Sequence, residues 1–452
     1  MGEAKRRGTF QERKDLRQSK ILKELTENMI DFSDQNMSYL KLGYEFLRDK
    51  LHPNDWLKRK QEIIEYLKDR PLDYSSPNGK IRFTTDETSW YIFLCEEFFR
   101  NPLLTNPSQI SRIAPWIISL GKSVSDLKKI EGIENKLKDL VKKYKGNPDG
   151  TLFELLVAAT YLKQGYSVEF LEENNLKTPD MRVFKGEENF YVECKKLQRR
   201  TDYAEKERNL FLKSWDESKK ILLKNYPNYW FFLEIKTELV DNEVINLIEK
   251  FDRLSEEGDI LSYEDSEVAL IGKKRDLYKI NNYLQANYVK MESFTFSKLL
   301  GEEYVYSNAD RTHILIMQPN ILEVASAPVL GLFVNKLGKF LGVTRIFTNE
   351  NSQNKKSKEV LKQVKEALDQ LENYQNRVVH VLYEALEDPV VELKRWGKIE
   401  DKMKELEKEL PADISIKIHN LTYYEDVNQM FDVQETIKSW GKRVPFSPFI
   451  IK

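Results

Sequence analysis

The chain contains few of the residues on which zinc-binding and disulfide-stabilised proteins depend. It has only two cysteines, Cys95 and Cys194, and four histidines among 452 residues. This scarcity excludes a disulfide framework and a zinc site built from neighbouring cysteines and histidines. The most apolar stretch, residues 324–334, is too short to span a bilayer, and the first residues lack the apolar segment of a signal peptide. We therefore expect a cytoplasmic protein that does not enter a membrane.

Two signatures of nucleic-acid enzymes are also missing. The formal net charge is −1, so no global excess of positive charge indicates nucleic-acid binding. Basic residues form local clusters instead, and such clusters are usually solvated surface. Gly121-Lys122-Ser123 is not a phosphate-binding loop, because Trp116 stands where that motif has its first glycine. The sequence therefore predicts no nucleotide-hydrolysing motor within the chain.

The N-terminal third of the chain has the pattern of a helical domain. Hydrophobic residues make up 40% of the sequence and aromatic residues 12%, which is enough for packed cores, and the length predicts two or three domains. Apolar residues recur at spacings of three and four up to residue 148. This spacing predicts helices at 21–32, 39–51, 55–67, 89–100 and 126–144. The turn residues Asn147-Pro148-Asp149-Gly150 then end a helical N-terminal domain, 1–148.

The rest of the chain has the pattern of an α/β fold with a mixed sheet. We expect a domain over 149–385, with its core at 151–236, and a C-terminal α/β extension over 386–452. Within the core, periodicity predicts the order helix, three strands, helix, strand. These elements are expected at 151–164, 166–170, 180–184, 189–197, 202–225 and 229–236. The later strands could extend the same sheet or form a separate one.

The predicted strand 189–197 carries the residues of chemical interest. Strand side chains alternate between two faces, so Cys194 lies on the core face while Glu193 and Lys195 share the other face. The hairpin turn at 185–188 folds the preceding strand antiparallel, which can bring Asp180 beside Glu193. Two carboxylates so close repel each other unless a divalent cation lies between them. Carboxylate oxygens suit Mg²⁺ or Mn²⁺.

These residues resemble the motif of the PD-(D/E)XK, or restriction-endonuclease-like, nucleases. The matching residues are Pro179-Asp180, then Glu193-Cys194-Lys195 thirteen positions after the aspartate, with Glu154 on the upstream helix. The αβββαβ core of that family has the element order predicted at 151–236. The resemblance covers about 90 of the 452 residues. Pro-Asp and Glu-x-Lys occur commonly in proteins. The resemblance therefore depends on the agreement of the motif with the hairpin and the element order.

The resemblance implies a role for each residue. Asp180 and Glu193 would bind Mg²⁺ or Mn²⁺, together with the main-chain carbonyl of Cys194. Lys195 would position and activate the attacking water and stabilise charge on the scissile phosphate. Glu154 would be the acid that some subfamilies use to orient a water on the metal or to bind a second metal.

Three basic residues follow the motif directly. Lys196, Arg199 and Arg200 would lie at the mouth of such a site, where they could contact phosphates flanking the cut. The resemblance further implies a DNA rather than an RNA substrate, and a homodimer, because cutting a duplex commonly needs two active sites. It also implies an endonuclease of the restriction or phage-defence type, whereas a protein partner for the flanking regions stays open.

Each site residue also has an ordinary structural explanation. Thr151 and Glu154 match a capping box at a helix start. Asp180 could be a turn residue after proline. Glu193 and Lys195 could be a surface ion pair on an edge strand. Pro148-Asp149 and Glu234-Ile235-Lys236 share the motif letters, but neither has the predicted context of a hairpin.

Two other functions compete with a nuclease. One is a nucleic-acid-binding or assembly protein built on a nuclease fold that has lost activity. The other is a helical interaction protein in which the motif is coincidental. The presence of Asp180, Glu193 and Lys195 together favours the enzyme.

Overall fold

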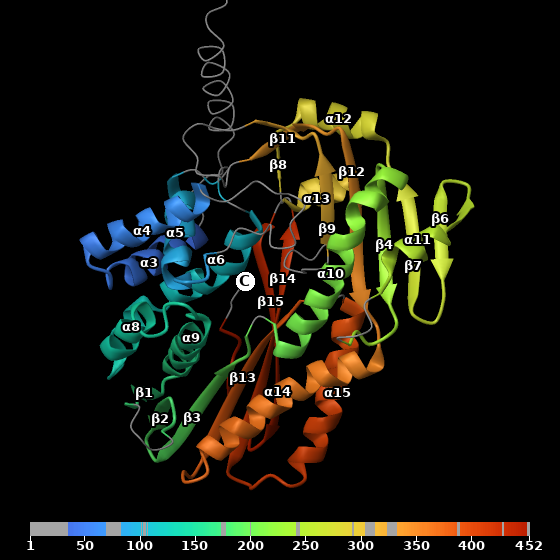
Figure 1. Cartoon of the computed structure of the whole chain (residues 1–452). Helices are drawn as coiled ribbons and strands as arrows, with labels where there is room; N and C mark the ends of the chain where they lie inside the picture. Colours follow the sequence, from blue (N-terminus) through green and yellow to red (C-terminus); the bar gives the residue numbers. More distant parts are fainter. Residues whose placement is uncertain are drawn as a thin grey trace, which may run out of the picture.

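The computed structural model describes residues 35–68, 83–100, 102, 105, 107–172, 178–198, 200–240, 245–291, 293–302, 312–322, 332–386, 389–426 and 429–449. This part of the chain contains 13 helices and two six-stranded sheets, each mixing parallel and antiparallel pairs, so the expected α/β class is confirmed. Figure 1 shows the first sheet between the N-terminal helices and helices α14 and α15, with the second sheet beside it. No helix in these ranges is both long and apolar enough to cross a membrane.

The N-terminal region is helical, as expected. Its helices are α3 (Gln35–Arg48), α4 (Pro53–Lys68), α5 (Glu87–Arg100), α6 (Pro107–Gly121), α7 (Val124–Leu127) and α8 (Ile133–Val141). The expected helix at 21–32 lies outside the described residues. The single helix expected over 126–144 is divided, because Gly132 has a positive φ of 83° that ordinary helical residues do not adopt. Helix α6 was not expected, since Pro115 interrupts its sequence pattern.

The first sheet contains the predicted motif strands. Its order is β1 (Ser167–Phe170), β2 (Met181–Lys185), β3 (Glu188–Lys196), β13 (Arg377–Ala385), β14 (Ile414–Asp426) and β15 (Gln429–Gly441). Helix α9 (Asp149–Lys163) and the N-terminal helices cover one face, where Phe153 and Val192 belong to one buried cluster. Helices α14 (Glu350–Gln370) and α15 (Pro389–Glu407) cover the other face, where Val364 and Val381 are buried. The N-terminal helices therefore share their core with the sheet.

The expected contiguous core at 151–236 is wrong in one respect. Strand β4 (Tyr229–Ile235) does not join the motif strands but lies inside the second sheet. The strand that pairs with β3 is β13, which is parallel to it and pairs Val379 with Glu193. Helix α14 precedes β13 directly along the chain. It packs on the face of the first sheet where Val381 of β13 is buried. Helix α10 (Asp202–Asn225) and the second sheet are therefore inserted between β3 and α14.

The inserted segment builds its own sheet around the apolar strand β4. The order is β5 (Ser255–Glu257), β6 (Ile260–Glu264), β7 (Val268–Lys274), β4, β12 (Lys339–Phe347) and β9 (Thr312–Met317). Helices α10 and α11 (Leu247–Asp252) bury one face against Phe231 and Leu233. The other face carries Trp230 beneath α12 (Leu277–Ala286), α13 (Phe294–Leu300) and a small sheet of β8 (Val289–Lys290), β10 (Asn320–Leu322) and β11 (Phe333–Lys336). An almost continuous apolar strand suits this position, buried on both faces.

The C-terminal strands β14 (Ile414–Asp426) and β15 (Gln429–Gly441) join the first sheet, one of the two arrangements that the sequence allowed. Strand β14 is parallel to β13, and β15 is antiparallel to β14, so both extend the first sheet. The described residues of the expected C-terminal extension, 389–426 and 429–449, therefore belong to the same core as the motif strands.

Candidate active site

The hairpin of β2 and β3 brings Asp180 to Glu193. Gly186 has a φ of 58°, which allows the two-residue turn between Lys185 and Glu188. The resulting register pairs Met181 with Val192, so Asp180 precedes β2 at the level of Glu193. The Cys194 backbone N–H donates a hydrogen bond of 2.7 Å to Asp180 Oδ2. Asp180 therefore contacts the neighbouring strand and is more than a local turn residue.

Glu193 and Lys195 share one face of β3, as strand alternation predicted. Lys195 Nζ lies 2.6 Å from Glu193 Oε1. The pair is not an exposed pair on an edge strand, because β3 lies between β2 and β13 and Glu193 is only 1% exposed. The explanation as a surface ion pair is therefore wrong.

The surroundings of the Glu193 carboxyl group disfavour its charged form. Burial, and then the neighbouring Asp180 carboxylate, raise the pKa of Glu193 to about 8, although Lys195 opposes the shift. Its Oε2 atom is buried and accepts no hydrogen bond within the described part of the chain. Burial alone would lower the pKa of Lys195, but the adjacent Glu193 raises it, so this amine stays protonated at neutral pH. A buried acid with an oxygen lacking a donor is suited to accept a proton or a cation.

Glu154 reaches the site through a lysine that the sequence did not indicate. Helix α9 begins at Asp149, so Thr151 is not its N-cap, and the capping-box explanation of Glu154 is wrong. Lys136 Nζ, from helix α8, lies 2.5 Å from Glu154 Oε2 and 3.9 Å from Asp180 Oδ1. Glu154 also contributes to the raised pKa of Glu193, as the weakest of its causes.

Gln370 is a second site residue that the sequence did not reveal. Lys195 Nζ donates to Gln370 Oε1 at 2.9 Å, and Gln370 Nε2 donates to the Thr178 carbonyl at 2.9 Å. Gln370 therefore connects the lysine of β3 with the loop that leads to Asp180. It follows Lys195 by 175 positions in the chain, and no local pattern marks it.

The expected phosphate-binding residues are corrected by the structure. The Lys196 side chain is 2% exposed and forms an ion pair of 3.0 Å with Glu384, so it does not lie at the mouth of the site. The cause is strand alternation, which turns Lys196 to the face opposite Lys195. Arg200 pairs with Glu205 and lines a separate cavity. Arg199 lies outside the described residues.

The acidic residues do not form a compact cage of three carboxylates. Within the described ranges, no group of three or more His, Cys, Asp and Glu side chains is close enough to hold a metal ion. Mg²⁺, however, is commonly held by one or two carboxylates and several waters. Asp180 and Glu193 fit that smaller set, because the Asp180 carboxylate lies close enough to Glu193 to raise its pKa, and no described residue donates a hydrogen bond to Glu193 Oε2.

The two other matches to the motif letters lie in different surroundings. Asp149 is buried and accepts hydrogen bonds from Tyr91 and Arg112. Glu234 lies on β4 of the second sheet and accepts a hydrogen bond of 2.7 Å from Thr348. Asp149 therefore belongs to the ion-pair network of Arg112, Glu384 and Lys196, on the opposite face of β3 from Glu193 and Lys195, and Glu234 belongs to the other sheet. Comparison of the chain with protein-family models, curated proteins and solved structures gives no match.

Proposed function

We propose that the protein is a metal-dependent nuclease that hydrolyses phosphodiester bonds, with DNA as its substrate. The observation that carries the proposal is the Glu193 carboxyl group, buried beside Asp180 and Lys195 with an oxygen to which none of the residues that the structure describes donates a hydrogen bond. A structural ion pair would not need a second carboxylate next to it. A cation between the two carboxylates would relieve their repulsion.

The order of the elements supports a restriction-endonuclease-like core. Helix α9, strands β1 to β3, helix α14 and strand β13 follow one another in the order αβββαβ once the inserted segment is set aside. The last strand is parallel to β3, and α14 is the crossover between them. The proposed core is therefore split in the sequence, with α10 and the second sheet as an insertion.

The residues would divide the chemistry among them. Asp180 and Glu193 would hold Mg²⁺ or Mn²⁺, with the Cys194 carbonyl as a further ligand. The ion, when bound, would supply positive charge for the anionic transition state of phosphodiester hydrolysis. Lys195, kept protonated by Glu193 and oriented by Gln370, would stabilise charge on the scissile phosphate. Glu154 would orient water at the edge of the site, where Lys136 now contacts it.

Cleavage of supercoiled plasmid tests the proposal. We expect cutting with Mg²⁺ or Mn²⁺ and none with EDTA. Asp180→Asn should lower the rate by on the order of 10³-fold, because it removes the charge that holds the cation. The asparagine keeps an acceptor for the Cys194 N–H, so the hairpin should stay folded.

A matched control compares the Glu-x-Lys triplet of the proposed site with a Glu-x-Lys triplet elsewhere in the fold. Glu193→Gln and Glu234→Gln make the same chemical change in two Glu-x-Lys triplets that begin on strands, one on β3 and one on β4. We expect Glu193→Gln to abolish cutting and Glu234→Gln to leave the rate within twofold. Equal activity of all these variants would contradict the proposal.

One observation favours a second candidate, a nucleic-acid-binding protein without activity. The Lys136 ammonium already lies close to Glu154 and Asp180, where it supplies the positive charge that a metal would bring. If it keeps that position, the chain would bind nucleic acid without cutting it. Retention of DNA by the wild type in a gel-shift assay, with no cutting under any metal, would support this candidate.

The proposal includes a homodimer, since cutting both strands of a duplex needs two such sites. Sedimentation of the wild type with and without DNA tests this part.

A further inference from the structure

Arg182 lies beside the proposed active site, on the same face of the hairpin. The register of β2 and β3 pairs Arg182 with Tyr191, which stands two residues before Glu193. Tyr191 and Glu193 share one face of β3, and paired residues of an antiparallel ladder project to the same face. Arg182 therefore lies one step along the hairpin from Glu193, a distance of about 7 Å along the strand.

Two contacts within the hairpin hold the Arg182 guanidinium in place. Its Nε donates a hydrogen bond of 2.9 Å to Asn189 Oδ1, and the group lies 5.2 Å from the centre of the Phe184 ring. Phe184 and Asn189 pair with each other across the two strands, one step further from Glu193. A side chain that is already oriented in this way loses little conformational freedom when it binds a ligand.

The terminal nitrogens of this guanidinium are available to a ligand. Within the described ranges of the chain, neither Nη atom forms a hydrogen bond or an ion pair. Glu169 pairs with Arg182 from β1, but the two side chains form no ion pair. The Arg182 side chain is half-buried rather than enclosed. The donors that remain form a planar fork, which matches the oxygens of a phosphate group.

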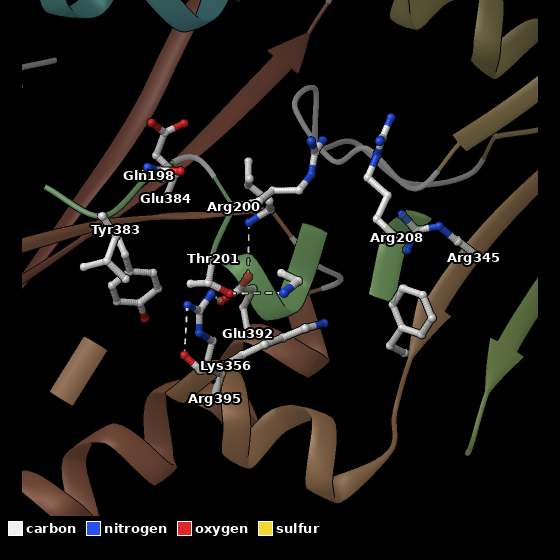
Figure 2. A pocket seen from close by; sticks show the side chains of 14 residues that line it. Gln198, Arg200, Thr201, Arg208, Arg345, Lys356, Tyr383, Glu384, Glu392 and Arg395 are labelled. Atoms are coloured by element: carbon white, nitrogen blue, oxygen red, sulfur yellow. Dashed lines mark hydrogen bonds and ion pairs between the residues drawn. The ribbon is translucent and has the colours of Figure 1, made fainter. Parts of the chain in front are cut away.

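The cations around the cavity between the two sheets differ from Arg182 in this respect. Figure 2 shows that cavity, which the segment after β3 and helices α10, α14 and α15 line. Four of its cations are paired with acids: Arg200 and Arg208 with Glu205, Lys356 with Glu207, and Arg395 with Glu392. The charge of these four is compensated within the protein, so they do not require an anion from outside.

Positive charge flanks the proposed metal ligands on both sides along the hairpin. Lys195 stands two residues after Glu193, and Arg182 lies one step before it. Lys195 is already bound to Glu193 and to Gln370. One step along a strand is close to the spacing of successive phosphates in a nucleic-acid backbone. A scissile phosphate at Asp180 and Glu193 would therefore place a neighbouring phosphate at Arg182.

We propose that Arg182 binds the phosphate next to the scissile one, so that the cleaved strand runs along the hairpin of β2 and β3. The inference rests on the proposed function, because it takes Asp180 and Glu193 as the point of cleavage. A contact with the backbone phosphate contributes affinity and register but reads no base. Arg182 is therefore a substrate-binding residue without a part in sequence preference.

Binding of a fluorescently labelled DNA duplex in EDTA, at several salt concentrations, tests this subsite without cleavage. Arg182→Gln should weaken binding about three- to tenfold, and the slope of log Kd against log salt should decrease by about 0.9, because one phosphate contact is lost. Arg182→Lys keeps the charge but loses the planar fork, so it should weaken binding about two- to threefold with an unchanged slope. With Mg²⁺, Arg182→Gln should raise KM and leave kcat within about twofold.

Lys185→Gln is the matched control on the same strand. Lys185 ends β2, projects to the opposite face and donates to the Gln164 carbonyl at 3.2 Å, so its loss should change neither affinity nor slope. Circular dichroism checks folding. If Arg182→Gln does not fold, Arg182→Lys decides, and wild-type affinity in that variant would count against the subsite.

The binding data separate this inference from the proposed function. DNA binding with no cutting under any metal would contradict the nuclease, while the slope for Arg182→Gln would still decide whether Arg182 contacts a phosphate. No binding by the wild type, or an unchanged slope in Arg182→Gln, would overturn the subsite. The second result would do so even if the wild type cuts DNA.

Discussion

At the residue scale, the unusual feature of the molecule is the ionisation of Glu193. When folding raises the pKa of a carboxyl group, the folded state is more stable relative to the unfolded state while that group is protonated. This contribution is fully present below the ordinary pKa of glutamate, near 4.5, and is lost as the pH rises through about 8. In the absence of metal, the free energy of unfolding should therefore decrease as the pH rises from about 4.5 to about 8.

Glu193→Gln should remove this dependence on pH. Glutamine resembles the protonated acid and carries no charge beside Asp180. With EDTA present, we expect the variant to gain stability relative to the wild type as the pH rises from 5 to 8, by on the order of 2 kcal/mol at pH 8. Urea unfolding at several pH values measures the difference. Glu234→Gln is the control, and a Glu193→Gln difference that does not change with pH would contradict the assignment.

At the scale of elements, helix α14 connects the proposed active site with the rest of the fold. It crosses over between β3 and β13, and Gln370 at its end contacts both Lys195 and the Thr178 carbonyl. Near its start, Lys356 forms a buried ion pair of 2.6 Å with Glu207 on α10 of the inserted segment. The position of Lys195 thus depends on an element that is remote in the sequence.

Gln370→Ala should impair catalysis without impairing metal binding. Lys195 would lose the hydrogen bond that orients it, while the two carboxylates would stay in place. We expect the cleavage rate to fall about tenfold, and the Mn²⁺ dissociation constant to change less than twofold. Gln363→Ala, at a partly exposed position of the same helix, should have no effect on either. A parallel loss of metal affinity would show that Gln370 supports the carboxylates instead.

At the scale of the whole molecule, the N-terminal helices contribute directly to the proposed site. They share the buried cluster that contains Val192 and Cys194, and α8 brings Lys136 to Glu154 and Asp180. A cation binding at Asp180 and Glu193 has to compete with this ammonium group. Any movement of α8 would therefore alter the affinity for metal.

Lys136→Ala should strengthen the binding of Mn²⁺. Removal of a positive charge beside two carboxylates should raise the affinity by about three- to tenfold, because the competing cation is lost. Titration calorimetry measures this directly. Lys138→Ala, at an exposed position on the same helix, is the matched control and should leave the affinity unchanged. Weaker binding in Lys136→Ala would indicate that the lysine supports the site.

The parts of the site that depend on local geometry were predictable from the residues alone. Strand alternation placed Glu193 and Lys195 on one face, and the turn at Gly186 set the register that brings Asp180 to them. The helical N-terminal region and the α/β class followed from hydrophobic periodicity in the same way. These features arise from residues close together in the chain, where one pattern has one geometric consequence.

The strand that pairs with β3 and the distant residues that complete the site became known only from the folded chain. Periodicity predicts strands at 229–236 and at about 378–384, which the structure has at 229–235 and 377–385, but it contains no information about their partners. Gln370 and Lys136 are ordinary polar residues on helices, and only packing brings them to Lys195 and Glu154. Long-range pairing depends on how whole faces of helices and sheets fit together, a property that no short segment of sequence carries.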